Sequence, residues 1–166
     1  MLQTIYFFLP AGFANMAPIL FQWIPWLNTP IDSGKRFRSR MLFGDHKTWR
    51  GIVAGLLLGT AIAYVQSFYP FGILPSGWIF LGLVQSIGAL LGDLIKSFFK
   101  RQRGISPGKP WMPFDQLDFI VGAIIMTSLF FSIPLKFVIS ALILAPLFHI
   151  AANRIGYYLQ IRQTPW

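Results

Sequence analysis

Long apolar runs separated by short polar segments dominate this chain. Five runs approach the length of about 20 apolar residues that a helix needs to cross the hydrocarbon core of a bilayer. They cover residues 5–27, 52–69, 78–95, 119–133 and 135–152. Only Pro134 separates the short fourth run from the fifth, so these two predict either a tight helical hairpin or one broken helix. The pattern predicts an all-α integral membrane protein, a bundle of about five transmembrane helices.

Glycine spacing supports close packing of the second and third runs. Gly51, Gly55 and Gly59 recur every four residues, as do Gly88 and Gly92, which places small residues on one face of each predicted helix. Such faces let helix backbones approach closely in lipid, although ordinary membrane glycine content gives the same pattern without any contact. Because the chain has no internal repeat and no low-complexity linker, we expect residues 1–166 to form a single domain.

Composition agrees with a membrane protein and narrows the possible chemistry. Charged residues make up 11% of the chain, against about 25% in soluble domains. Cysteine is absent, which excludes disulfides, thiolate nucleophiles and cysteine metal sites. The two histidines, His46 and His149, are far apart in sequence, which argues against a zinc site. The net charge of +9 comes from basic residues beside apolar runs, so we expect a bilayer rather than nucleic acid as partner, and no protein partner.

The distribution of basic residues predicts the topology. The 28–50 loop holds six Lys and Arg residues and the 96–118 loop holds five, whereas the N-terminal end and the 70–77 loop hold none. The positive-inside rule places both basic loops and the C-terminus, with Arg154 and Arg162, in the cytoplasm and the N-terminus outside. Lys136 is the exception. No basic residue precedes the first run, so we expect it to stay as a membrane helix rather than to act as a signal peptide.

The acidic residues are five aspartates, and three of them flank the second basic loop. At the end of the third run, Asp93, Lys96, Ser97 and Lys100 share one helical face. The aspartate can bind a divalent metal there while the lysines contact phosphate oxygens. An ion pair with snorkelling lysines at a cytoplasmic helix end explains the same residues without any ligand.

The loop that follows has the composition of a phosphate-binding segment. Basic residues at Lys100, Arg101 and Arg103 precede the sequence GISPGKP at residues 104–110, which cannot form a regular helix. Glycine-rich backbone can wrap phosphate groups while nearby cations such as Lys109 neutralise them. A solvated cytoplasmic turn accounts for the charges equally well.

Two further aspartates begin the fourth helix. Asp115 and Asp118 lie on one face if the segment is helical, directly before an apolar run. Either can cap the helix or interact with its dipole. One carboxylate would suffice as a cap, however, and Mg²⁺ typically takes one or two carboxylates together with substrate phosphates. The pair therefore favours a Mg²⁺ site.

The first basic loop ends in GDHKTWRG at residues 44–51. Lys47, Thr48 and Arg50 supply donors for phosphate, but the segment lacks the Gly-Lys-Ser/Thr core of a Walker A loop. We interpret His46 as a loop hydrogen-bonding residue rather than a catalytic base. Upstream, the basic run at residues 35–40 has a simpler interpretation as a contact to anionic lipid headgroups.

Together, GDHKTWRG (44–51) and GDLIKSFFKRQRG…GKPW…PFDQLDF (92–119) resemble the CDP-archaeol synthase family. Members are small membrane cytidylyltransferases that resemble phosphatidate cytidylyltransferases in their C-terminal part. The resemblance is strong from residue 44 to about residue 122 and extends to overall length and five-span layout. It implies transfer of a cytidylyl group from CTP to a lipid phosphate monoester, in this family an isoprenoid ether lipid. The products are a CDP-lipid for phospholipid synthesis and pyrophosphate.

The resemblance also implies residue roles, with the two cytoplasmic loops forming the site. Asp93, Asp115 and Asp118 would hold Mg²⁺, and with Lys96 they would form the catalytic set. The nucleotide and phosphate groups would contact Lys47, Thr48, Arg50, Ser97, Lys100, Arg101, Gly104 and Lys109.

Elementary chemistry agrees with this reaction. A lipid phosphate is already an anionic nucleophile, so the reaction needs no strong general base. Metal ions and fixed cations overcome the repulsion between two polyanions and stabilise the leaving pyrophosphate. A CDP-alcohol phosphotransferase is disfavoured because its spaced Asp-Gly and Ala-Arg pattern is missing. The alternative from another class is a non-enzymatic membrane lipid-binding or transport protein whose loops serve only topology.

Overall fold

The computed structural model describes residues 1–71, 77–106 and 109–160, which form five α-helices and one small hairpin. The elements are α1 (Leu2–Leu20), β1 (Arg36–Phe37), β2 (Arg40–Met41), α2 (Trp49–Phe68), α3 (Trp78–Gln102), α4 (Phe114–Ser128) and α5 (Leu135–Tyr158). The prediction of an all-helical protein is confirmed, and the antiparallel two-stranded hairpin is the element that it missed. Arg162 and most of the predicted outer loop, residues 72–76, lie outside the described residues.

Several helix bounds differ from the predicted runs, and α3 and α5 continue to Gln102 and Tyr158, beyond residues 95 and 152 where their runs end. Within the described residues, α2, α3 and α5 are long and apolar enough to cross a membrane. Helix α1 ends at Leu20 rather than at residue 27. Pro25 disfavours helical backbone at Ile24, which opposes a helix through the predicted end of this run. Helix α4 has 15 residues and lies five residues earlier than its predicted run. Five transmembrane helices therefore remain a prediction, of which three meet the length and composition of a span.

Helices α1 and α2 are in close backbone contact. A Cβ atom at Gly55 would lie 2.9 Å from the carbonyl oxygen of Ala14, and one at Gly59 would lie 2.8 Å from that of Pro10. Gly51 likewise packs against the ring of Pro18, with 3.1 Å to its Cβ. The close approach predicted from the four-residue glycine spacing is confirmed here.

Pro10 of α1 leaves a backbone carbonyl without a helical donor, and a side chain of α2 satisfies it. Pro10 has no N–H, so it cannot donate to the carbonyl of Tyr6 one turn earlier. The buried Gln66 of α2 donates its Nε2 to that oxygen at 2.5 Å. Gln85 of α3, fully buried, donates its Nε2 to the neighbouring carbonyl of Phe7 at 3.0 Å. These side chains fix α1 against α2 and α3 by hydrogen bonds that lipid cannot offer.

Helices α3 and α4 also meet through glycine. A Cβ at Gly92 would lie 2.1 Å from the carbonyl oxygen of Asp118, and one at Gly122 would lie 2.1 Å from that of Gly88. A side chain at either position would displace the facing backbone. The second glycine pair predicted from sequence therefore brings the start of α4 directly onto the C-terminal half of α3.

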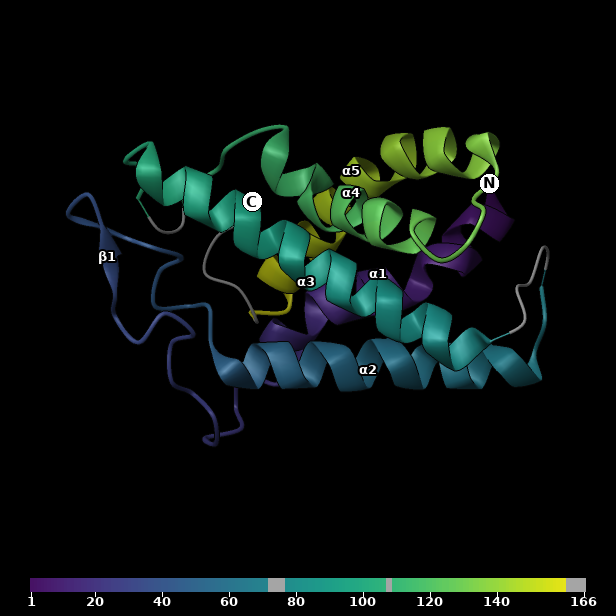
Figure 1. Cartoon of the computed structure of the whole chain (residues 1–166), viewed down its shortest axis with the longest axis horizontal. Coiled ribbons are helices and arrows are strands. Elements are labelled where there is room, and N and C mark those ends of the chain that lie inside the picture. The colour runs from purple at the N-terminus through teal and green to yellow at the C-terminus, as the bar shows by residue number, and fades with distance from the viewer. Residues whose placement is uncertain (72–76, 107–108, 161–166) are drawn as a thin grey trace.

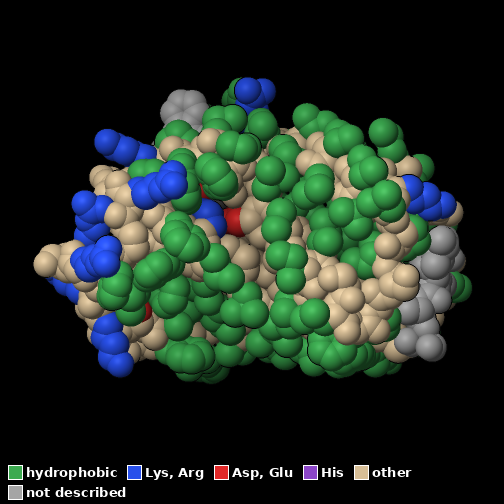
Figure 2. Space-filling view, turned by 45° about the horizontal axis from the view of Figure 1, so that its top comes forward, with side chains coloured by type: hydrophobic (Ala, Val, Ile, Leu, Met, Phe, Trp, Pro, Cys, Tyr) green, Lys and Arg blue, Asp and Glu red, His purple; other side chains and the backbone are tan. Residues whose placement is uncertain are grey.

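The bundle leaves one end polar and most of its sides apolar. Figure 1 shows α3 running between α2 and α4, with the β1–β2 hairpin and the long 28–48 segment beside the end of α3. Figure 2 shows most of the basic side chains of one face gathered at one end, with an acidic side chain visible in a hollow near them. Many apolar side chains are exposed over the rest of that face, between backbone and other side chains, as expected where helices face lipid.

Candidate active site

Three aspartates converge on the side chain of one lysine at the polar end of the bundle. The Lys96 Nζ atom lies 3.3 Å from Asp93 Oδ1, 3.0 Å from Asp115 Oδ1 and 2.9 Å from Asp118 Oδ2. The side chain of Asp118 is only 4% exposed. The structure therefore brings the four residues of the predicted catalytic set together around one ammonium group.

The fold explains this convergence. Asp93 and Lys96 are one turn apart on α3, and Asp115 and Asp118 occupy the first turns of α4. The absence of a side chain at Gly92 lets the α4 backbone at Asp118 reach α3. Residues separated by more than twenty positions thus share one site because two helices pack at van der Waals distance.

Two further lysines neutralise the outer side of the cluster. Lys47, from the segment before α2, forms an ion pair with Asp93. Lys100 lies 2.7 Å from Asp115 Oδ2, which also accepts a hydrogen bond from the Trp111 backbone N–H at 2.6 Å. Pro113 is the N-cap residue of α4 and makes no side-chain cap. Asp115 is therefore bound to groups outside its own helix, and the capping interpretation does not describe it.

The surroundings shift the pKa values of Asp115 and Asp118 in opposite directions. Both carboxylates lie before the predicted fourth apolar run. Burial and the neighbouring charge of Asp93 raise the pKa of Asp118 to about 6, against the opposing effect of Lys96. Burial also acts to raise the pKa of Asp115, but the hydrogen bond from Lys100 and the charge of Lys96 outweigh it, so this pKa lies below its usual value. Asp118 is thus the carboxylate of this pair that protonates first as the pH falls.

The cluster forms one wall of a cleft of about 880 Å³. Most of the residues predicted to bind phosphate line it as well. They are Lys47, Thr48, Arg50, Lys100 and Lys109. Arg50 also donates from Nη1 to the carbonyl of Ile24, and Thr48 Oγ1 accepts from Gly51 N–H at 3.3 Å as the N-cap of α2. These two residues therefore fix the loop in addition to facing the cleft.

Three residues predicted for phosphate binding do not line the cleft. Ser97 is buried, and the Arg101 side chain lies 3.8 Å from where a Cβ would stand on Gly44. Gly104, with φ +75°, faces the guanidinium of Arg40. Gly104 thus provides the left-handed turn after α3, which favours glycine. Pro107 and Gly108 of the predicted phosphate loop lie outside the described residues.

The opposite wall of the cleft was not predicted. It is formed by α1 and α5 and includes the polar residues Asn15, Gln22, His149 and Asn153, while Asn28, Asp45 and His46 line its loop side. His149 stacks on Phe119 with ring centroids 6.5 Å apart. Its Nδ1 lies 3.3 Å from Asn153 Nδ2. A polar side chain within an apolar run, as at Asn15 and His149, was the signal that could have found this wall.

The donor atoms at the cluster suit a hard divalent cation. Carboxylate oxygens are the ligands that Mg²⁺ prefers. In the part of the chain that the structure describes, however, no group of three or more His, Asp or Glu side chains is spaced to hold a metal ion. The oxygens of Asp93, Asp115 and Asp118 surround an ammonium group instead. The chemistry of the ligands fits a metal, provided that Lys96 moves out of their centre.

A family model described as "CarS-like: CDP-archaeol synthase" matches residues 1–166. The chain belongs to the CDP-archaeol synthase family. It is 37% identical to the CDP-archaeol synthase of Pyrococcus furiosus, covering 99% of this chain and 98% of that protein. It is 42% identical to the CDP-archaeol synthase of Methanospirillum hungatei, over 82% of this chain and 89% of that protein.

A solved structure is similar over nearly the whole fold. It is described as an intramembrane enzyme for archaeal membrane lipids biosynthesis, with a TM-score of 0.79 and 32% sequence identity. The alignment covers 92% of this chain and 94% of that one. As a member of the CDP-archaeol synthase family, the protein is an integral membrane enzyme, a CTP-dependent cytidylyltransferase. The predicted family and enzyme class are confirmed, and the non-enzymatic alternative is wrong.

Proposed function

We propose that this protein, as a single domain, transfers the cytidylyl group of CTP to an isoprenoid ether lipid phosphate monoester. The products are a CDP-lipid of the CDP-archaeol type and pyrophosphate. The observation that carries the proposal is the convergence of three carboxylates and three lysines in one cleft at the basic end of a membrane bundle. Polyphosphate chemistry needs this combination of metal ligands and fixed cations.

Asp93, Asp115 and Asp118 would hold Mg²⁺ between them. When bound, the ion supplies Lewis-acid neutralisation of the triphosphate charge. The Lys96 side chain carries a positive charge that the carboxylates hold at their centre, 2.9 Å from Asp118. If these carboxylates held a metal ion, the ammonium of Lys96 would be released to contact the phosphates. Lys96 would then serve as counter-ion in the resting site and as phosphate ligand in the loaded one.

The remaining basic side chains orient the nucleotide. Lys47 approaches from the segment before α2, Lys100 from α3, and Lys109 from the loop before α4, so the cations surround the cleft from three elements. An oxygen of the lipid phosphate attacks the α-phosphorus of CTP. The bond from that phosphorus to the bridging oxygen breaks, and pyrophosphate leaves with the electron pair. No proton needs to be removed from the nucleophile, so neither His46 nor His149 has a role as general base.

The cleft also offers an apolar wall to the lipid. Met16 and Ile19 of α1, Phe119 of α4, and Phe148 and Ala152 of α5 line it next to the carboxylates. A lipid phosphate in this position would place its headgroup at the cations and its first carbon atoms against these side chains. We place the cleft on the cytoplasmic side, where CTP is found, with the N-terminus outside, in agreement with the basic loops.

The test is turnover by purified protein in detergent with labelled CTP and Mg²⁺. The lipid is geranylgeranyl ether lipid phosphate or, separately, diacyl phosphatidic acid. We expect a CDP-lipid with the ether lipid and at least a hundredfold loss in Asp118→Asn, with the fold retained. Lys136→Gln is the control, since it removes a charged side chain at the start of α5, outside the cleft. Full activity of Asp118→Asn, or no product from folded protein with either lipid, would overturn the proposal.

A further inference from the structure

A second cavity lies outside the catalytic cleft, between the hairpin and the end of α3. Its volume is about 490 Å³. The lining residues are Phe37, Arg38 and Arg40 from the hairpin and Phe98, Phe99 and Gln102 from α3. None of the six lines the catalytic cleft. The cavity is therefore a separate site and has no role in the chemistry proposed above.

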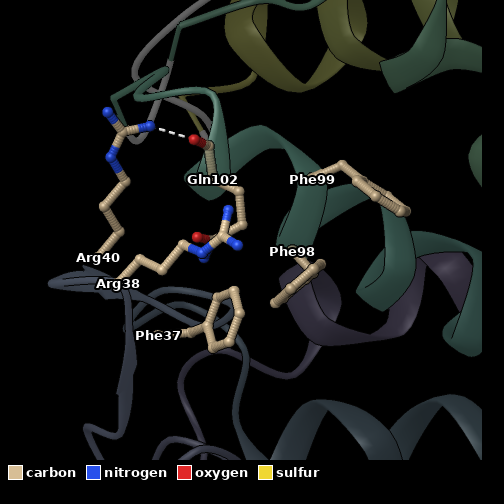
Figure 3. A pocket seen from close by; sticks show the side chains of 6 residues that line it. All are labelled: Phe37, Arg38, Arg40, Phe98, Phe99 and Gln102. Atoms are coloured by element: carbon tan, nitrogen blue, oxygen red, sulfur yellow. Dashed lines mark hydrogen bonds between the residues drawn. The ribbon is translucent and has the colours of Figure 1, made fainter.

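A tight turn holds the two arginines at this cavity. The β1–β2 hairpin turns through Arg38 and Ser39, which have φ values of 50° and 65°. Two successive left-handed residues match the twist of a two-residue hairpin, but this conformation normally favours glycine or asparagine. Non-glycine residues persist there when their surroundings fix them. Figure 3 shows the side chains of Arg38 and Arg40 extending from this turn toward Gln102.

Both guanidinium groups are available to an anion. Arg40 donates from Nη1 to the carbonyl oxygen of Gln102, and the Arg38 guanidinium lies 5.3 Å from the centroid of the Phe37 ring. Among the described residues, the ion pairs of the protein involve lysines only, so neither arginine has a carboxylate partner. Arginine binds phosphate through two parallel N–H donors, which makes phosphate the fitting anion.

The other side of the cavity is aromatic and continues into an apolar stripe. The rings of Phe37 and Phe98 are 6.1 Å apart, and those of Phe98 and Phe99 are 5.5 Å apart. On α3, Leu91, Ile95 and Phe99 follow each other at four-residue spacing and are 43%, 57% and 52% exposed. This spacing places them in one row along the outer face of the helix. A soluble anion would leave the row unused, whereas a lipid chain would cover it.

We propose that this cavity binds the headgroup phosphate of an anionic membrane lipid that is not the substrate. Arg38 and Arg40 bind the phosphate, and the hydrocarbon chain lies along Phe99, Ile95 and Leu91. A polybasic surface near a bilayer attracts anionic lipids in general. The turn geometry and the aromatic wall make this surface a defined site for one headgroup.

A lipid bound in this cavity would also stabilise the 28–48 segment, which carries residues of the catalytic cleft. The hairpin belongs to the 28–48 segment, which carries Lys47, the ion-pair partner of Asp93. Within this segment, Asp32 accepts hydrogen bonds from Gly34 N–H and Phe43 N–H on either side of the hairpin, both at 3.0 Å. A lipid that ties the hairpin to α3 therefore ties the segment that presents Lys47. This activity consequence rests on the proposed function, whereas lipid binding itself does not.

The experiment measures binding of phosphatidylglycerol to the purified protein in neutral detergent, by native mass spectrometry and by the shift in unfolding temperature. Phosphatidylglycerol is a phosphate diester, so it cannot replace the monoester substrate. We expect the double variant Arg38→Gln/Arg40→Gln to bind it at least tenfold more weakly than the wild type. Lys35→Gln/Arg36→Gln is the matched control, because it removes the same two charges from the same segment outside the cavity. It should bind as the wild type does.

Three outcomes would overturn the proposal. Equal weakening in Lys35→Gln/Arg36→Gln would reduce the effect to general surface charge. Binding of glycerol 1-phosphate as tight as that of phosphatidylglycerol would identify a site for soluble phosphates, with no role for the α3 stripe. Unchanged lipid binding in the double variant would remove the arginines from the site. If the double variant does not fold, Arg38→Gln alone decides, since Arg40 is the one of the two that is hydrogen-bonded to the α3 backbone. Because binding is read without turnover, failure here is distinguishable from failure of the proposed function.

Discussion

The carbonyl oxygen of Asp118 lies against Gly92, where a Cβ atom would approach it to 2.1 Å. This contact joins α3 to α4 at the level of the carboxylate cluster. It also sets the position of Asp118 relative to Asp93, one residue after Gly92. The geometry of the site therefore depends on a hydrogen atom in place of a methyl group, at a residue with no chemistry of its own.

Gly92→Ala should accordingly damage both stability and activity. The backbone of Asp118 cannot give way without moving α4, so we expect a loss of about 3 kcal/mol, at the upper end of overpacking costs. Turnover of the folded fraction should fall more than tenfold because the carboxylates separate. Thermal unfolding in detergent and the CTP assay measure the two effects. For stability, Gly12→Ala is the comparison, since a Cβ there meets nothing within 4 Å; similar losses in both variants would contradict the packing explanation.

In Lys96→Met, a Mg²⁺ ion should take the place of the missing ammonium group between the carboxylates. Without the ammonium, the three carboxylates repel one another, so the variant should gain thermal stability on addition of Mg²⁺ while the wild type changes little. Turnover should fall by about 10²–10³, as for loss of a group that stabilises transition-state charge. For the effect of Mg²⁺ on stability, Lys109→Gln is the control, because Lys109 lines the same cleft but forms no ion pair within the described part of the chain. If Mg²⁺ did not change the unfolding temperature of Lys96→Met, a metal ion would not occupy the position of the Lys96 ammonium group, and the proposed metal site would be wrong.

The affinity of the metal should depend on pH through Asp118. Its pKa is raised to about 6, so this carboxyl becomes protonated and neutral as the pH falls through that value. Because a metal ligand must be deprotonated, Mn²⁺ affinity should fall about tenfold per pH unit below 6 and level off above 7. Titration followed by electron paramagnetic resonance measures this. Asp118→Asn should bind Mn²⁺ more weakly and without this pH dependence; an unchanged profile in the variant would exclude Asp118 as its origin.

Gln66→Leu should weaken the bundle far from the site. The change removes the Nε2 donor from the Tyr6 carbonyl, which Pro10 leaves without a helical partner. A buried carbonyl without a donor costs about 1–3 kcal/mol, so the unfolding temperature should drop while turnover at low temperature stays normal. Ser67→Ala, one residue on, loses an exposed hydroxyl bond to Tyr64 and should be neutral. Equal stability of both variants would show that Gln66 is not needed to satisfy α1.

Local pattern predicted much of this fold and half of the site. The helical spacing of Asp93 and Lys96, and of Asp115 and Asp118, places each pair on one face, and glycine spacing indicated the close contacts between helices. What joins the two pairs is a tertiary contact at Gly92, and no pattern within either helix fixes the partner of that glycine. The sequence therefore predicted the residues of the cluster without the central position of Lys96.

The hairpin and one wall of the cleft were not predicted from the sequence, for physical reasons. The hairpin consists of two-residue strands and turns at Arg38 and Ser39, which carry none of the usual Asn-Gly signal. The α1 and α5 wall of the cleft depends on helices that are far apart in sequence. Asn15 and His149 gave a weak signal, because a polar residue in a membrane run can face a cavity or a neighbouring helix.

The position of Lys96 between the carboxylates affects the stability of the enzyme when no substrate is bound. Three carboxylates face Lys96, Lys47 and Lys100, so the charges of the resting site balance without any bound ion. If magnesium binds these carboxylates, folding in the membrane would not depend on it, and a chelator should abolish activity reversibly while leaving the bundle intact. In the resting enzyme Lys96 thus occupies the position that a metal ion would take between the carboxylates.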